Sequence, residues 1–125
     1  MAYKILVVDD TLVIRGFLKE VLTDMGFDVE LAENGQIGYD MVVNGNYTLI
    51  FSDVHMPEMN GEEMVKKIKQ VKPEIPIVMT DSYPDKLAMK ATNAGAICCL
   101  AKPFDLNELR KIINGIIKPQ EKSTK

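Results

Sequence analysis

Six polar or charged side chains stand just after four short apolar runs of this chain. In chain order they are Asp9, Asp10, Asp53, Thr80, Asp81 and Lys102. If these apolar runs are parallel strands of one sheet, their carboxyl ends meet at one edge, where open parallel sheets bind ligands. A single aspartate at a strand end is more often a helix cap than a ligand. Three aspartates converging on one edge therefore indicate a functional site more strongly than any one of them does.

Three carboxylates in one crevice need electrostatic compensation. Two ionised carboxylates about 5 Å apart repel each other by about 3 kcal/mol at an effective dielectric constant near 20. A protonated carboxyl would relieve this repulsion, and so would a cation. Mg²⁺ suits an open carboxylate site better than zinc, which prefers His or thiolate ligands. The carboxylates therefore predict either a shared proton or a Mg²⁺ ion.

Lys102 and Thr80 extend this chemistry to phosphoryl groups. A lysine ammonium is a mobile point charge, and a threonine hydroxyl is a hydrogen-bond donor, so both are suitable partners for phosphoryl oxygens. Beside a bound Mg²⁺ ion, one of the aspartates can act as a nucleophile. The whole set predicts carboxylate, Mg²⁺ and phosphoryl chemistry.

The strands that must position these side chains are predicted by five short apolar runs. They cover residues 4–8, 29–32, 48–52, 75–79 and 97–100. Their length and β-branched content are typical of buried parallel strands. In the second run Glu30 separates two apolar residues, which favours a less buried edge strand.

Stretches with helical spacing separate and follow the strands. One apolar stripe runs from Ile14 to Met25 and stops at Gly26, and another runs from Leu106 to Ile117 after a cap at Asp105. Three weaker helices are expected at about residues 36–43, 62–71 and 85–93. The alternation of strand and helix predicts an α/β fold, a doubly wound (βα)5 arrangement with a five-stranded parallel sheet and helices on both faces.

Length and composition limit what this fold can do. The 125 residues amount to one domain, which we expect at residues 1–119, followed by a short polar tail at 120–125. The formal charge of −3 favours neither nucleic acid nor membrane as a partner. No apolar run approaches the ~20 residues of a membrane helix, and the start lacks a secretory signal, so we expect a cytoplasmic protein. Since one domain must hold the whole function, its output is expected to pass through a partner protein.

Several motifs carry a family resemblance. They are Ile5-Leu6-Val7-Val8-Asp9-Asp10, Asp53-Val54-His55-Met56-Pro57 with Glu58-Met59-Asn60-Gly61, Ile77-Val78-Met79-Thr80, Ala94-Gly95-Ala96 and Lys102-Pro103-Phe104. In content and order they resemble the receiver domain of two-component response regulators, of the stand-alone CheY-like kind. The resemblance spans nearly the whole chain and implies a flavodoxin-like (βα)5 fold.

The resemblance implies a role for each site residue. Asp53 would accept a phosphoryl group from the phosphohistidine of a histidine kinase or phosphotransfer protein. Asp10, Asp53 and the backbone carbonyl of His55 would ligate Mg²⁺, and Asp9 would hold the water shell of the metal. Lys102 would bind one phosphoryl oxygen. Thr80 would move toward a second phosphoryl oxygen once the phosphoryl group is present.

The resemblance also implies a type of output. The domain would be a signalling switch rather than an enzyme, with only weak Mg²⁺-dependent autophosphorylation and autodephosphorylation. Phosphorylation adds about −1.5 to −2 charges near neutral pH, which Thr80 and Lys102 would register. The family usually displays the resulting shift on the face formed by the fourth helix, fifth strand and fifth helix, where we expect the downstream target to bind.

Two positions depart from the family pattern. Cys99 stands where receivers commonly carry Tyr or Phe, so we expect signalling to use backbone and loop shifts near Thr80 instead of an aromatic rotamer. Asp81 stands where a small residue usually leaves an opening over the phosphoryl group. Its carboxylate could repel an incoming phosphodonor or point to solvent without effect.

Three other functions compete with the switch. A phosphorylation-independent interaction module that keeps the fold would tolerate Cys99 and Asp81. A phosphatase similar to the haloacid dehalogenases also uses an aspartate nucleophile and Mg²⁺, but wants a second aspartate two residues after the nucleophile, whereas Asp9 and Asp10 are adjacent. A flavodoxin-type electron carrier would need a Thr/Ser-rich phosphate loop after the first strand, which this sequence lacks.

Overall fold

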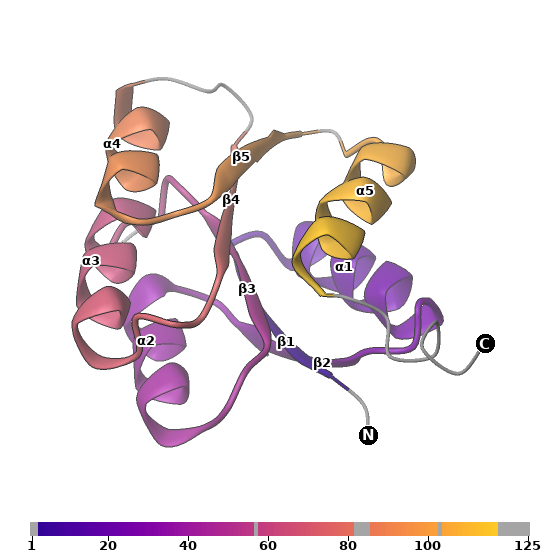
Figure 1. Cartoon of the computed structure of the whole chain (residues 1–125), viewed down its shortest axis with the longest axis horizontal. Helices are drawn as coiled ribbons and strands as arrows, with labels where there is room; N and C mark the ends of the chain where they lie inside the picture. Colours follow the sequence, from indigo (N-terminus) through magenta and orange to yellow (C-terminus); the bar gives the residue numbers. More distant parts are fainter. Residues whose placement is uncertain (1–2, 57, 82–85, 103, 118–125) are drawn as a thin grey trace.

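Five parallel strands form one sheet with helices on both faces in the computed structural model, which describes residues 3–56, 58–81, 86–102 and 104–117 (Figure 1). The strands are β1 (Lys4–Val8), β2 (Asp28–Ala32), β3 (Leu49–Asp53), β4 (Ile77–Asp81) and β5 (Cys98–Ala101). The helices are α1 (Leu12–Asp24), α2 (Gly35–Asn44), α3 (Gly61–Val71), α4 (Lys86–Ala94) and α5 (Leu106–Ile116). The predicted doubly wound (βα)5 fold is confirmed. The tail predicted at 120–125 lies outside the described residues.

The strand order places a topological switch point at the middle of the sheet. The order is β2-β1-β3-β4-β5, and each neighbouring pair is parallel. From β1 the chain winds first to β2 on one side and then crosses to β3 on the other. The crevice beyond the carboxyl ends of β1 and β3 is therefore the place where such sheets bind ligands.

Two hydrophobic cores fill the space between the sheet and its two helical layers. Helices α1 and α5 cover one face, and α2, α3 and α4 cover the other (Figure 1). Alternate residues of each strand supply the two cores, so Phe51 packs with Leu18 and Leu109 on the first side, whereas Ile50 packs with Met64 on the second. Because the central strands are buried on both faces, the site at their ends rests on a rigid support.

Two strands run further toward the site than the apolar pattern predicts. Parallel pairing continues through Asp53, opposite Thr80, and through Asp81, opposite Ala101. Asp53 and Asp81 are therefore the last residues of β3 and β4 instead of the first residues of the following loops. The edge strand β2 is only partly buried, as the position of Glu30 predicts.

Side-chain caps define where several helices begin. Asn34 accepts a hydrogen bond from the backbone of Ile37 at the start of α2, and Asn60 forms a reciprocal capping box with Glu63 at the start of α3. Asp105 caps α5, as predicted. Gly26, with φ at +99°, follows the end of α1 in the left-handed region that favours glycine. Among the helices of the described residues, none is long and apolar enough to cross a membrane.

Candidate functional site

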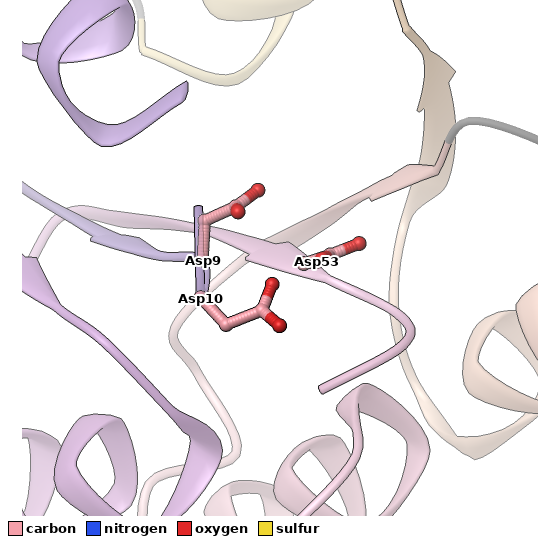
Figure 2. A group of neighbouring side chains, drawn as sticks. All are labelled: Asp9, Asp10 and Asp53. Atoms are coloured by element: carbon pink, nitrogen blue, oxygen red, sulfur yellow. The ribbon is translucent and has the colours of Figure 1, made fainter. Parts of the chain in front are cut away.

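Three carboxylates meet at the switch point of the sheet. Asp9 and Asp10 directly follow β1, and Asp53 ends β3, so the side chains come together from two adjacent strands (Figure 2). One carboxylate oxygen from each lies within 4.8 Å of the other two. Asp9 and Asp53 are buried, whereas Asp10 is exposed. The group therefore has a buried base and one side open to solvent.

Lys102 completes the group from the end of β5. Its Nζ atom lies 2.9 Å from Asp9 Oδ2 and 3.4 Å from Asp53 Oδ1. The backbone N–H of Lys102 donates a hydrogen bond of 2.8 Å to the carbonyl of Asp81, which fixes the chain where it leaves β5. One ammonium thus contacts the carboxylates of both Asp9 and Asp53, although Asp9 lies 93 residues earlier in the chain.

Both the side chain and the backbone of Asp9 form hydrogen bonds with the rest of the protein. Its Oδ1 atom accepts a hydrogen bond of 2.8 Å from the backbone N–H of Thr11, and its own N–H donates to the carbonyl of Ala32 at 3.0 Å. The guanidinium of Arg15 donates to the Asp9 carbonyl at 2.6 Å. The sequence gives no sign of this role for Arg15, because the contact depends on how α1 leaves the strand. Together these bonds orient the Asp9 carboxylate toward Lys102.

Burial and the neighbouring charges raise the proton affinity of Asp53. The pKa of Asp53 is raised to about 6, chiefly by burial and then by the negative charges of Asp9 and Asp10, against the opposing effect of Lys102. Burial alone would lower the pKa of Lys102, but its contacts with Asp9 and Asp53 raise it overall. The site is therefore short of positive charge, as the spacing of its carboxylates predicts.

The donor set fits a hard divalent cation. All the converging ligand atoms are carboxylate oxygens, which Mg²⁺ prefers, and the exposed position of Asp10 leaves room for the waters that the ion retains. Asp9 uses one oxygen for Thr11 and the other for Lys102. Asp10 and Asp53 are therefore the carboxylates best able to ligate the ion directly, with Asp9 beside them.

The remaining predicted residues lie around this group. Thr80 is buried and stands opposite Asp53 in the register of β3 and β4. His55 follows β3 by two residues, and its half-exposed side chain lies near the end of β4, with Nε2 at 3.6 Å from Asp81 Oδ2. The fold thus brings the predicted residues to one edge of the sheet.

Gly61 lets α3 begin directly against the end of β3. A Cβ atom at this position would lie 2.6 Å from the carbonyl oxygen of Asp53 and 2.9 Å from Cα of Val54. The N–H of Gly61 donates to the carbonyl of Val54 at 2.8 Å. The backbone that carries Asp53 is therefore fixed from the side of α3, and any larger residue at this position would displace it.

The two residues that depart from the family pattern are both partly or fully inside the protein. Cys99 is half-buried and packs against the core on the side of α2, α3 and α4. The side chain of Asp81 is only 3% exposed, so the suggestion that it points to solvent is wrong. Its carboxylate is not part of the group formed by Asp9, Asp10 and Asp53 within the described residues.

Comparison with known proteins identifies the family. The model of the response regulator receiver domain matches residues 5–114. The chain belongs to this receiver domain family. Sporulation initiation phosphotransferase F of Bacillus subtilis is 32% identical to this receiver over 114 residues, which cover 90% of this chain and 92% of that protein.

Longer regulators and solved structures show the same similarity. This receiver is 38% identical to the probable transcriptional regulator ycf29 of Pyropia yezoensis and 35% identical to the DNA-binding transcriptional regulator NtrC of Rhizobium meliloti, of which it spans 54% and 25%. These matches cover 94% and 97% of this chain. A CheY-like receiver of Methanospirillum hungatei superimposes with a TM-score of 0.90 at 28% identity, covering 98% of this chain and 99% of that one. Chemotaxis protein CheY4 of Vibrio cholerae gives 0.87 at 30% identity, covering 94% and 100%.

Proposed function

We propose that this receiver is a single-domain response regulator. It accepts a phosphoryl group on Asp53 from a histidine kinase or a phosphotransfer protein, with Mg²⁺, and signals in the cytoplasm by a conformational switch that a partner protein recognises. The observation that carries the proposal is the ammonium of Lys102, which lies 2.9 Å from Asp9 and 3.4 Å from Asp53 inside an acidic group. A cation so placed can hold a phosphoryl oxygen once Asp53 carries the phosphoryl group.

The chemistry proposed for Asp53 is an in-line transfer. A carboxylate oxygen of Asp53 attacks the phosphorus of a phosphoimidazole, the P–N bond breaks, and its electron pair returns to the imidazole ring. Bound Mg²⁺ would supply positive charge to the phosphoryl oxygens, and Asp10 and Asp53 would hold the ion with the backbone carbonyl of His55. The ammonium of Lys102 would stabilise the same charge. Thr80 is close enough in the sheet register to respond to the new group.

The proposed output lies on the face formed by α4, β5 and α5. Two exposed apolar side chains support this assignment, Met89 on α4 at 66% exposure and Ile97 just before β5 at 50%. A change at Thr80 reaches this face through β4, which pairs with β5. Catalysis by this domain is limited to slow, Mg²⁺-dependent phosphorylation and dephosphorylation of its own aspartate.

A second candidate is an interaction module that works without phosphorylation. It is favoured by one observation, the half-buried sulfur of Cys99 at a position where the resemblance leads us to expect an aromatic ring. Such a module would keep the fold and the partner face but would have no use for the acidic group.

Modification by a small phosphodonor separates the two candidates. The chain is incubated with acetyl phosphate, with and without Mg²⁺, and the intact mass is measured. We expect one added phosphoryl group that requires Mg²⁺ and is lost in Asp53→Ala. The matched control is Asp28→Ala, which removes an exposed carboxylate at the start of β2 and should be modified like the wild type. An unmodified wild-type chain without Mg²⁺ affinity would favour the interaction module, and turnover of a soluble phosphomonoester would favour a phosphatase.

A further inference from the structure

A contact between two side chains links the loop after β3 to the end of β4, beside the acidic group but separate from it. Nε2 of His55 lies 3.6 Å from Oδ2 of Asp81. The two partners differ sharply in burial, since the His55 side chain is 50% exposed and that of Asp81 only 3%. A buried carboxylate is costly unless it is compensated, so this contact stabilises Asp81 and at the same time restrains an exposed histidine.

The segment that carries His55 is fixed at its start by the backbone. The N–H of Val54 donates to the carbonyl of Thr80 at 3.1 Å, and the carbonyl of Val54 accepts from Gly61 at 2.8 Å. His55 is the next residue, and its side chain reaches across to the neighbouring strand. The contact with Asp81 therefore restrains His55, the first residue after these two hydrogen bonds of Val54, and with it the peptide group that carries the His55 carbonyl.

Asp81 lies beside the candidate metal ligands without being one of them. In the described residues the carboxylates that converge for a cation are those of Asp9, Asp10 and Asp53, and Asp81 is outside this group. Its backbone carbonyl accepts the N–H of Lys102 at 2.8 Å, so the end of β4 is itself tied to the residue that bridges Asp9 and Asp53. Because the end of β4 is fixed by this hydrogen bond, Asp81 can restrain His55 in the loop after β3.

We propose that Asp81 is a positioning residue that, through its contact with the His55 side chain, orients the His55 backbone carbonyl for Mg²⁺. This inference rests on the proposed function, because the carbonyl matters only if the acidic group binds the metal. This role would explain why a carboxylate stands at position 81, where its negative charge could otherwise only repel a phosphodonor. Outer contacts that orient metal ligands are worth about 10-fold or more in affinity.

The test is a double-mutant cycle read as Mg²⁺ affinity by calorimetry, without any phosphodonor. His55→Ala keeps the backbone carbonyl and changes an exposed side chain, so it should fold like the wild type. We expect His55→Ala and Asp81→Ala each to weaken Mg²⁺ binding by about 10-fold, and the double variant to be no weaker than either one. The sign of the His55 effect is diagnostic, because a side chain that acted only through a positive charge would, when removed, let Mg²⁺ bind more tightly.

The matched control is another ion pair near the start of α3. Glu62 and Lys66 form a pair of 3.1 Å, so Glu62→Ala removes a carboxylate of the same charge from an ion pair to which His55 does not belong. We expect this variant to bind Mg²⁺ as the wild type does. Unchanged or tighter binding by His55→Ala, or losses from His55→Ala and Asp81→Ala that simply add, would overturn the inference while leaving the proposed function intact. A wild-type chain that binds no Mg²⁺ would refute the proposed function and the inference with it.

Discussion

Two charged clusters of this receiver have opposite electrostatic characters. The first is the acidic group of Asp9, Asp10 and Asp53 with Lys102, at the carboxyl ends of the strands. The second lies around β1 and β2, where Lys4 forms a salt bridge of 3.3 Å with Glu30, and the hydroxyl of Tyr47 donates to the same carboxylate. We call this the Glu30 cluster.

The difference lies in how many hydrogen-bond donors and cations each carboxylate has. In the Glu30 cluster one carboxylate has a phenol donor and an ammonium, and the hydrogen bond from Tyr47 lowers the pKa of Glu30 against the opposing effect of burial. In the acidic group three carboxylates converge, Lys102 contacts two of them, and burial together with like charges raises the pKa of Asp53. The Glu30 cluster is complete and stabilises the fold. The acidic group has more negative than positive charge, which is the property expected of a site that could hold a cation.

The largest expected difference between the clusters concerns their lysines. Lys102→Met should lower the free energy of unfolding by about 3 kcal/mol, because it leaves the buried Asp9 carboxylate without its ammonium. Lys4→Met removes the same type of residue from a salt bridge in which both side chains are 42% exposed, and should cost less than about 1 kcal/mol. Urea unfolding at pH 7.5 with a chelator measures both. Equal losses would mean that the acidic group is no more dependent on its lysine than a surface pair.

The second prediction is that replacing Asp53, a residue of the acidic group, stabilises the fold. Asp53 has a pKa raised to about 6 in the folded chain, so its ionised form opposes folding. The cost is fully present above pH 6, and it disappears as the pH falls through 6 toward the unfolded-state pKa near 4. Asp53→Asn should therefore raise the free energy of unfolding of the metal-free chain by about 2 kcal/mol at pH 7.5 and by almost nothing at pH 4.

The same unfolding measurements supply the control for Asp53. Asp28→Asn changes an exposed carboxyl at the start of β2 and should leave stability unchanged across this pH range. Saturating Mg²⁺ should stabilise the wild type more than Asp53→Asn, because it binds the folded state through the carboxylate. A stability gain of Asp53→Asn that is the same at pH 4 and pH 7.5 would show that ionisation of Asp53 is not its cause.

The sequence was sufficient to predict the sheet and the edge that carries the acidic group. Strands and helices follow from local apolar periodicity, and the carboxyl ends of parallel strands meet by geometry, so the meeting of Asp53 with the residues after β1 needs no knowledge of side-chain positions. The limit of β3 was less predictable, because pairing with β4 extends the strand through a charged residue. Backbone pairing overrides the low strand propensity of aspartate there.

The contacts between side chains could not be predicted in this way. The hydrogen bond from Arg15 to the Asp9 carbonyl depends on the angle at which α1 leaves the sheet. The pair of His55 with Asp81 depends on the path of a loop and the register of two strands. Residue type alone suggests that Asp81 either repels a phosphodonor or faces solvent. Its burial beside His55 excludes the second of these alternatives.

The smallest expected effect concerns the completed cluster. Tyr47→Phe removes the hydroxyl that donates to Glu30 and should lower the free energy of unfolding by about 1 kcal/mol at pH 7, because a half-exposed carboxylate regains part of that bond from water. Since the pKa of Glu30 is lowered by folding, its contribution is present above the unfolded-state pKa and is lost as the pH falls through the folded-state value. The stability cost of Tyr47→Phe should therefore grow as the pH rises from 3, whereas Asp53→Asn should gain stability over the same rise, so the two effects change with pH in opposite directions. Unfolding curves of both variants across pH 3 to 8 test this, and parallel pH trends would contradict the electrostatic difference between the two clusters.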